Sequence, residues 1–295
     1  MPVGDLCALA AGFVWSISII LMRVSGLSVP PLALNFFKSS VALLCFAALM
    51  VTIPGTWMSG LPAEAHFRLI VSGIFGIAFA DTMVAAALNR LGASLQALAD
   101  CVYSPAIAIV GFLMFGERLS PLEVVGGALV VSGVFVGAAM TAEVKSTRDL
   151  ISGIILAAGA HVMLAVSILI VRDIYRDGSI IWVTSYRFLI AVVALSLWGL
   201  VKYPKQLKEK LFLGFRRVEL WKTMIPMTVL GPFLATIFWV AGFKFSTAGR
   251  AAIFNQLSTV FIIILAYFFL KEKFTKRKAI GTILAVVGSI IVAMQ

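Results

Sequence analysis

The fold is decided by the stretch from Leu88 to Ala138, LNRLGASLQALADCVYSPAIAIVGFLMFGERLSPLEVVGGALVVSGVFVGA, because its pattern occurs twice in the chain. It holds the end of one apolar segment, a break at Gly92, a second apolar segment, a charged turn at Glu117 and a third segment with spaced glycines. The same order recurs 155 residues later. The matching positions are Glu117 and Glu272, Gly126 and Gly281, and Gly133 and Gly288. Apolar sequences match one another by chance, but a charged turn and a glycine spacing that coincide indicate an internal duplication.

The composition is that of a membrane protein. Apolar residues make up 61% of the 295 positions, charged residues make up 13%, and the mean hydropathy is +1.07. A soluble domain has roughly 45–50% apolar and about 25% charged residues. The net charge of +11 comes from residues in short gaps between apolar runs, and not from one basic face with polar surface around it. We therefore expect contact with the lipid bilayer and no nucleic-acid partner.

Ten apolar segments account for nearly the whole chain. They are residues 4–23, 31–52, 67–89, 92–115, 121–141, 149–171, 179–201, 222–244, 247–270 and 277–294. Each is close to the roughly 20 residues that cross a hydrocarbon core of about 30 Å. Only the connections 53–66 and 202–222 are long, so there is no room for a soluble domain. The sequence predicts an all-α integral membrane protein with ten transmembrane helices.

The duplication divides the chain into residues 1–145 and 146–295, with five predicted spans in each half. In the first pair of spans of each half, Arg23 aligns with Arg172 and Lys38 with Arg187. Because five is odd, the second half enters the membrane from the opposite side, which gives a five-plus-five inverted repeat. Inverted repeats are typical of secondary transporters, whose substrate site lies near the midplane between the halves.

The quoted motifs resemble the EamA branch of the drug/metabolite transporter superfamily. They are FADTMVAAALNRLG (79–92), GASLQALADCVYSP (92–105), FGERLSP (115–121) and the glycines that follow. The resemblance covers nearly the whole chain and implies alternating access around a central cavity. It also implies the movement of small metabolites, often the export of amino acids or related compounds, in some members by exchange. The second half departs from the pattern, since Lys271 precedes Glu272 and no proline matches Pro105, so the two halves are not expected to be functionally equal.

Ionisable residues at membrane depth are costly, and they are therefore candidates for binding a substrate or an ion. These residues are Lys38, Asp81, Asp100, His161, Arg187 and, less deeply, Arg250. Asp81 and Asp100 each lie about nine residues from the turn at Arg90–Leu91, which puts both roughly 13–14 Å into the membrane. Lys38 and His161 reach a similar depth. We expect one polar cavity that holds these groups.

Two interpretations of this cluster are open. In the functional one, Asp81 or Asp100 carries a coupling proton or holds a substrate ammonium group. Lys38 or Arg187 would then bind a carboxylate. In the structural one, Lys38 forms a buried ion pair with an aspartate or extends to the interface, and His161 is an interior residue instead of a proton relay. Further candidates for the cavity wall, with helix packing as the alternative for each aromatic residue, are Trp15, Asn35, Tyr103, Tyr186 and Asn255.

Other classes of protein fit the sequence less well. The residues before Asp81 and Asp100 do not match intramembrane aspartyl proteases, and His66 and His161 have no metal-ligand spacing. The three cysteines lie in different segments, and the absence of a Gly-Lys dipeptide excludes a P-loop. We expect no catalysis, no metal and no cofactor, and a transporter driven by exchange or by an ion gradient, with protons as the candidate ion. The alternatives are an integral membrane enzyme and a non-transporting scaffold.

The expected location is the cytoplasmic (inner) membrane of a bacterium or archaeon, with the chain as a monomer or homodimer. The loops 23–30, 89–92, 141–149, 202–222 and 271–277 share one side and carry most of the Lys and Arg residues. The positive-inside rule puts that side in the cytoplasm and both termini outside. The family resemblance implies the opposite orientation.

Overall fold

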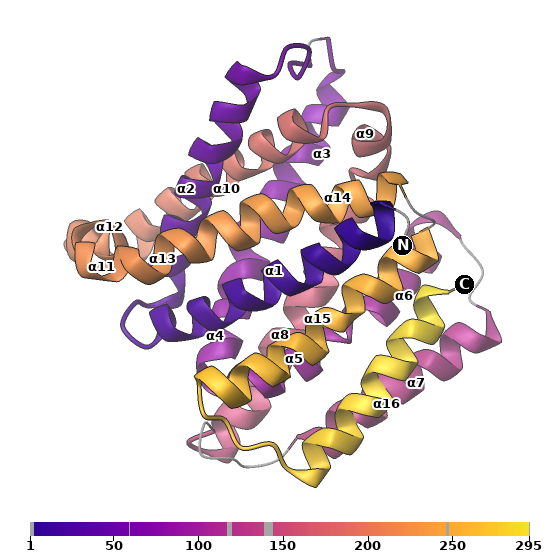
Figure 1. Ribbon diagram of the computed structural model, residues 1–295. Coiled ribbons are helices and arrows are strands. Elements are labelled where there is room, and N and C mark those ends of the chain that lie inside the picture. Colours follow the sequence, from indigo (N-terminus) through magenta and orange to yellow (C-terminus); the bar gives the residue numbers. More distant parts are fainter. Residues whose placement is uncertain (1–2, 59, 117–119, 139–143, 246–247, 295) are drawn as a thin grey trace.

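Helices form nearly all of the structure, a computed structural model that describes residues 3–58, 60–116, 120–138, 144–245 and 248–294 (Figure 1). The side chains of residues 243–244 and 248–253 are not described. Glu117 therefore lies outside the described residues, as does the side chain of Arg250. No strand occurs in the described part of the chain.

Seven helical runs among the described residues are long and apolar enough to cross a membrane. They are α1 (Val3–Gly26), α2 (Pro31–Thr52), the run α3–η1–α4 (Ala63–Leu91), the run α5–α6 (Ala93–Phe115), α8 (Thr147–Leu169), α10 (Ile180–Lys202) and the run η2–α13–η3–α14, apolar over Val218–Gly242. The other apolar helices are α7 (Pro121–Gly137), α15 (Ala248–Phe269) and α16 (Lys276–Ala293). The prediction of an all-α membrane protein is confirmed.

The breaks between helices follow from local sequence. Ser120 accepts a hydrogen bond from the backbone N–H of Glu123, and the Glu123 carboxylate accepts one from the N–H of Ser120, which forms a capping box at the start of α7. The hydroxyl oxygens of Ser146 and Ser179 cap α8 and α10 by accepting hydrogen bonds from the backbone N–H groups of Asp149 and Trp182. Between α4 (Asp81–Leu91) and α5 (Ala93–Asp100), Gly92 has a φ of +78°, which favours glycine, so the sharp break falls where the sequence predicts it.

Two π-helical segments occupy matching positions in the two halves. They are η1 (Gly73–Ala80) and η3 (Val229–Ala235), which lies between α13 (Trp221–Thr228) and α14 (Thr236–Phe245). Pro232 lies inside η3, where it has no backbone N–H to donate. No proline lies in η1, whose carbonyl oxygens instead accept hydrogen bonds from the side chain of Asn35 on α2. Such segments are frequent at functional sites, and both end immediately before a polar residue, Asp81 or Thr236.

The same hydrogen bond joins the α-helix before each π-helical segment, α3 or α13, to a helix of the other half. On α1, the Ser18 hydroxyl donates to the carbonyl oxygen of Met227 at 2.7 Å. On α8, the Ser167 hydroxyl donates to the carbonyl oxygen of Ser72 at 2.9 Å. Ser18 aligns with Ser167, and Ser72 lies 155 residues before Met227. Equivalent sequences therefore make equivalent contacts between the halves.

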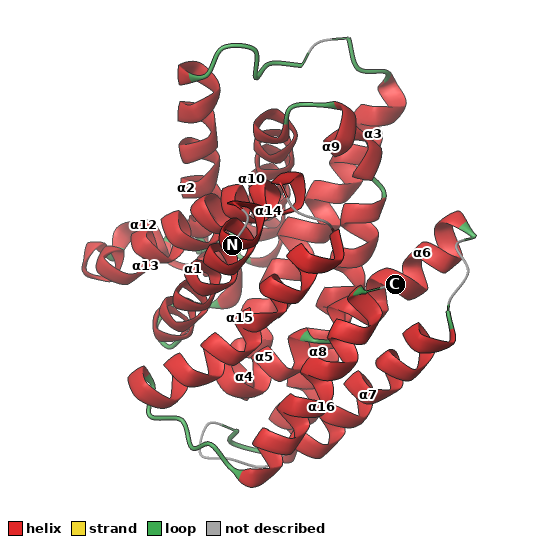
Figure 2. Ribbon diagram, turned by 45° about the vertical axis from the view of Figure 1, so that its right-hand side comes forward, coloured by secondary structure: helices red, strands yellow, loops and turns green. Residues whose placement is uncertain are grey.

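The glycines shared by the repeat bring α7 and α16 together. The two helices lie side by side in both views (Figure 1 and Figure 2). A Cβ atom on Gly133 would come within 2.6 Å of the backbone oxygen of Gly281, and one on Gly288 within 2.5 Å of the backbone oxygen of Gly126. Any larger residue at these positions would push the helices apart, so the spacing that identifies the repeat also sets this packing.

Candidate functional site

A cavity of about 340 Å³ lies in the middle of the bundle. Its walls come from α1, η3, α14 and α15 on one side and from η1, α4, α5, α6 and α8 on the other, with α2 and α10 between them. Eight of the residues predicted from the sequence line it: Trp15, Lys38, Asp81, Asp100, Tyr103, His161, Arg187 and Asn255. The expectation that the intramembrane charges meet in one cavity agrees with this arrangement.

The other two predicted residues, Asn35 and Tyr186, do not line the cavity. The Asn35 amide is buried and donates to backbone oxygens of η1, so it supports the wall from behind. The Tyr186 hydroxyl lies 3.3 Å from Nδ1 of His66, and its ring stacks on Trp182. Because a helix turns by about 100° per residue, Tyr186 points away from the cavity while Arg187 faces it. A position next to Arg187 in the sequence therefore does not place Tyr186 in the cavity wall.

Several lining residues were not predicted. Thr184 lies three residues before Arg187, so helical spacing could have found it. Trp239 lies three residues after Thr236 and could have been found in the same way. Tyr175 belongs to α9 (Arg172–Asp177), a short helix between two spans, and nothing in its sequence context indicates a role in the cavity.

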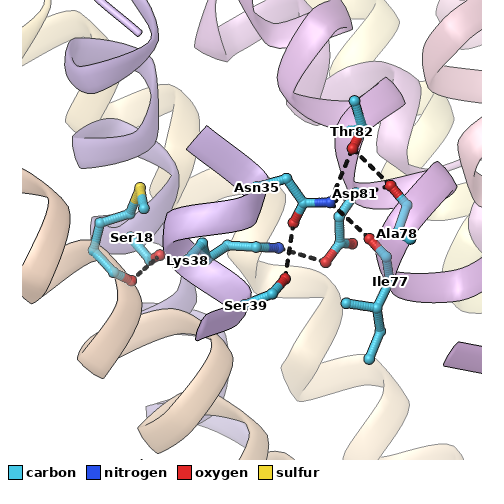
Figure 3. Close-up of polar contacts among 9 residues, drawn as sticks. Ser18, Asn35, Lys38, Ser39, Ile77, Ala78, Asp81 and Thr82 are labelled. Atoms are coloured by element: carbon cyan, nitrogen blue, oxygen red, sulfur yellow. Dashed lines mark hydrogen bonds and ion pairs between the residues drawn. The ribbon is translucent and has the colours of Figure 1, made fainter. Parts of the chain in front are cut away.

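Lys38 and Asp81 form an ion pair across the cavity wall (Figure 3). Nζ of Lys38 on α2 donates to Oδ2 of Asp81 at the start of α4, and the side chains are only 8% and 22% exposed. Asn35 binds Thr82, the residue after Asp81, at 2.9 Å, and Ser39 binds Asn35 at 3.2 Å. This network holds α2, η1 and α4 in register, which agrees with the structural interpretation of Lys38.

Asp100 and His161 form a second pair. Nε2 of His161 on α8 lies 3.4 Å from Oδ1 of Asp100, the last residue of α5. The other ring nitrogen, Nδ1, lies 2.8 Å from the carbonyl oxygen of Ala157, one turn earlier in α8. The amide of Gln96 donates to Oδ1 of Asp100 at 2.6 Å. Tyr103 packs edge-on against the imidazole, with ring centres 5.9 Å apart.

Arg187 is the second cation of the cavity, and the described residues place no carboxylate within 4.0 Å of it. Nη1 donates to the hydroxyl of Tyr175 at 2.9 Å and Nη2 to that of Ser167 at 2.8 Å. Nε is buried with no partner among the described residues. A Cβ atom on Gly76 would overlap the Ser167 side chain and lie 3.1 Å from Nη2 of Arg187, so the absence of a side chain at Gly76 makes space for the contact between Ser167 and Arg187.

One end of the cavity is closed by hydrogen bonds between α1 and α4. Nη1 of Arg23, near the end of α1, donates to the carbonyl oxygens of Leu88 and Asn89 at 3.1 and 2.9 Å. The Asn89 amide in turn donates to the carbonyl oxygen of Gly26 at 3.0 Å. A cluster of buried apolar residues from α1, α2, α4, α5, α13 and α15 fills the space beside them. The cavity is sealed on this side.

The same end carries a cap that crosses from one half to the other. The buried carboxylate of Glu272, between α15 and α16, accepts hydrogen bonds from the backbone N–H groups of Ala93 and Ser94 at 2.7 and 2.9 Å. It also accepts one from the Ser94 hydroxyl at 2.6 Å. The opposite end of the cavity reaches Tyr175 in α9, outside the spans, on the side where both ends of the chain lie (Figure 1).

A helical membrane bundle that surrounds a buried, charged cavity, sealed at one end, has the architecture of a membrane transport protein. The sequence profile of the EamA-like transporter family matches residues 2–138 and again residues 151–294. The chain belongs to this family, a non-enzymatic transporter family within the drug/metabolite transporter superfamily.

Among solved structures, a crystal structure of a protein described by no further name matches with a TM-score of 0.65 and 18% sequence identity. The match covers 98% of this chain and 95% of that one. At this identity the similarity shows the fold alone. No curated protein matches the chain.

Proposed function

We propose that this protein is a secondary-active transporter that moves small zwitterionic or amphiphilic metabolites, such as amino acids, by alternating access around the central cavity. Its placement would be the cytoplasmic membrane of a bacterium or archaeon, as a monomer or homodimer. The observation that carries the proposal is Arg187, a buried cavity cation with no carboxylate partner among the described residues.

The comparison of the two halves supports an anion-binding role for Arg187. Its equivalent in the first half, Lys38, is neutralised by Asp81. The position equivalent to Asp81 in the second half is Thr236, which carries no charge. Arg187 is therefore left to pair with a group that the protein itself does not supply. A guanidinium positioned by Tyr175 and Ser167 suits a carboxylate, which it can bind with two hydrogen bonds.

The rest of the cavity fits the body of a small metabolite. Trp15, Phe188 and Trp239 give it large apolar surfaces, and Asn255 adds a neutral amide to the wall. A volume of about 340 Å³ lies at the lower end of the roughly 300–1,000 Å³ usual for small-molecule sites, which suits solutes of amino-acid size.

The inverted repeat would supply the mechanism. We propose ten spans, five in residues 1–145 and five in residues 146–295, with opposite orientations in the membrane. The paired π-helical segments and the matching bonds of Ser18 and Ser167 support this arrangement, since each occurs at equivalent positions in the two halves. When the two halves exchange conformations, the sealed end opens and the other end closes around the same site.

A ligand screen followed by a flux assay tests the proposal. Purified protein is heated with a panel of amino acids and other small metabolites, and solutes that raise the melting temperature are retained, because a ligand stabilises the folded state by mass action. Each is then tested for counterflow in liposomes. We expect saturable counterflow that Arg187→Gln reduces at least tenfold, with His66→Gln, outside the cavity, as the matched control. Binding without flux, or flux that Arg187→Gln leaves intact, contradicts the proposal.

A further inference from the structure

The two ion pairs of the cavity differ in what sets their charge. Lys38 and Asp81 join a lysine and a carboxylate, which carry opposite charges across the physiological pH range. In the other pair, the partner of Asp100 is His161, whose charge depends on a bound proton. The side chains of Asp100 and His161 are 20% and 10% exposed, and both residues line the cavity. A proton in the cavity can therefore reach this pair.

Hydrogen bonding determines which nitrogen of His161 is free. The carbonyl oxygen of Ala157 can only accept a hydrogen bond, so Nδ1 of His161, at 2.8 Å from it, carries the hydrogen. In the neutral imidazole, Nε2 is then an acceptor, and it lies 3.4 Å from Oδ1 of Asp100, which is also an acceptor when ionised. Two acceptors that face each other gain a favourable contact only when a proton lies between them.

We propose that the Asp100–His161 pair is the proton-coupling site of the transporter and that it carries one proton per transport cycle. The inference rests on the proposed transport function. The proton is shared between Nε2 of His161 and Oδ1 of Asp100, which Gln96 holds in place. It is taken up when the cavity is open to one side of the membrane and released when the cavity is open to the other.

The contact that the repeat relates to this pair holds no second proton site. His161, in the second half, is equivalent to Gly12 in the first half, and Asp100, in the first half, is equivalent to Asn255 in the second half. Neither Gly12 nor Asn255 binds a proton at physiological pH. A Cβ atom on Gly12 would lie 3.3 Å from the backbone oxygen of Asn255, so α1 and α15 pack closely where the equivalent helices α8 and α5 hold the imidazole and the acid. Of these two equivalent contacts between the halves, the α1–α15 contact packs closely and the α8–α5 contact holds a proton.

The surroundings of the pair decide which substrate the proton accompanies. The charged and titratable groups that line the cavity around the pair are Asp81 on α4, Lys38 on α2, Tyr103 on α6, Arg187 on α10 and Tyr175 on α9, and Cys101 directly follows Asp100. Towards the pair, α1 and α15 present the neutral residues Trp15, Asn255 and Gln256. Arg90, at the end of α4, is turned to the carbonyl oxygen of Ala86.

The charges of these groups make proton and carboxylate binding cooperative. Without the proton, Lys38 and Arg187 balance Asp81 and Asp100. With the proton, the cavity has one net positive charge, which favours a substrate carboxylate at Arg187. Coupling of this kind is reciprocal and typically amounts to about 5–150-fold in affinity. The proton and a substrate carboxylate should therefore travel in the same direction, whereas a cationic substrate would compete with the proton.

The first test needs no substrate. The chain has only two histidines, so a His66→Gln background leaves His161 as the single histidine signal in ¹⁵N NMR of the full chain in lipid nanodiscs. We expect the Nδ1–H tautomer at high pH and a titration whose midpoint changes by at least one pH unit in Asp100→Asn, with a smaller change in the matched variant Asp81→Asn. An Nε2–H tautomer, or a titration that Asp100→Asn leaves in place, overturns the proposal.

The second test separates coupling from transport. Liposomes that contain the protein are given a mixture of ¹⁴C-labelled L-amino acids, and counterflow is compared with accumulation driven by a pH gradient. In Asp100→Asn and His161→Gln, we expect the fold-loss of accumulation relative to wild type to be at least ten times the fold-loss of counterflow. In Asp81→Asn, we expect accumulation and counterflow to fall in parallel. If the wild-type protein shows counterflow but a pH gradient drives no accumulation, the coupling site is overturned and the transport function stands. An absence of wild-type counterflow overturns both for this class of substrate.

Discussion

Removal of the Glu272 carboxylate should weaken the sealed end of the cavity. This side chain is 3% exposed, and it is the acceptor for two backbone N–H groups and one hydroxyl at the start of α5. It comes from the connection between α15 and α16, so the cap ties the second half to the first. In Glu272→Ala, the N–H groups of Ala93 and Ser94 lose their acceptor.

The expected loss follows from the number of donors left without a partner. A buried donor that loses its acceptor costs about 1–3 kcal/mol. The Ser94 hydroxyl can rotate to another acceptor, so we count only the two backbone donors and expect about 2–6 kcal/mol for Glu272→Ala. At about 2–4 °C per kcal/mol for a large domain, the melting temperature falls by roughly 4–24 °C. Glu272→Gln keeps one oxygen acceptor and should lose less than half as much.

The assay is thermal unfolding of the purified protein in detergent, followed by intrinsic tryptophan fluorescence. Ser94→Ala is the matched control, because it removes one hydroxyl donor and leaves both backbone bonds to Glu272 intact, with an expected cost of about 1 kcal/mol. A melting temperature of Glu272→Ala within one degree of wild type would refute the reasoning. So would a Ser94→Ala variant as unstable as Glu272→Ala.

Three further predictions concern the packing and the ion pairs. Lys38→Met leaves the Asp81 carboxylate buried without its partner and should destabilise the protein by about 3–5 kcal/mol. The double variant Lys38→Met/Asp81→Leu should recover most of this loss in the same melting assay. A double variant no more stable than the single one argues against a structural pair. Gly133→Ala puts a Cβ atom 2.6 Å from backbone atoms of α16 and should destabilise the protein by about 1–3 kcal/mol. Gly127→Ala is the control and should be nearly neutral, because its Cβ would meet Pro105 at 3.4 Å. Equal melting temperatures of the two variants would contradict this account of the α7–α16 contact. Burial by itself raises the pKa of the half-exposed Asp173 carboxyl, but the hydrogen bond and charge of Arg68 outweigh it and hold that pKa below its ordinary value. The unfolded chain therefore binds this proton more readily, and the pair stabilises the protein above about pH 4 and ceases to do so as the pH falls through the folded-state pKa. Asp173→Asn should thus lower stability by about 0.5 kcal/mol at neutral pH and have no effect in strong acid, and a loss that persists in acid contradicts the pairing.

Part of this structure could be predicted from the sequence because the relevant physics is local. The cost of exposing polar backbone to lipid requires long apolar helices, so 61% apolar residues and the segment lengths indicate the membrane class. The cost of burying charge marks Lys38, Asp81, Asp100, His161 and Arg187 as candidates, and all five line the cavity. The resemblance in the repeated motifs indicates the family, which the profile match shows.

Other features depend on how the helices are rotated and packed. Depth along the helices puts Asp81 and Asp100 at one level, but the rotation of α4 and α5 turns each towards a different partner, Lys38 or His161. The same rotation puts Arg187 in the cavity and Tyr186 outside it.

Contacts between distant segments also had no signal in the sequence. The shared position of Glu272 suggests a role at a helix end, but only the fold brings its carboxylate to the first turn of α5, across some 180 residues of chain. The π-helical segments before Asp81 and Thr236 likewise follow no sequence rule for helices. Local sequence determines which groups are buried, because the cost of burial belongs to each residue. Only tertiary packing determines which groups meet, because a partner is a property of two helices and their relative rotation.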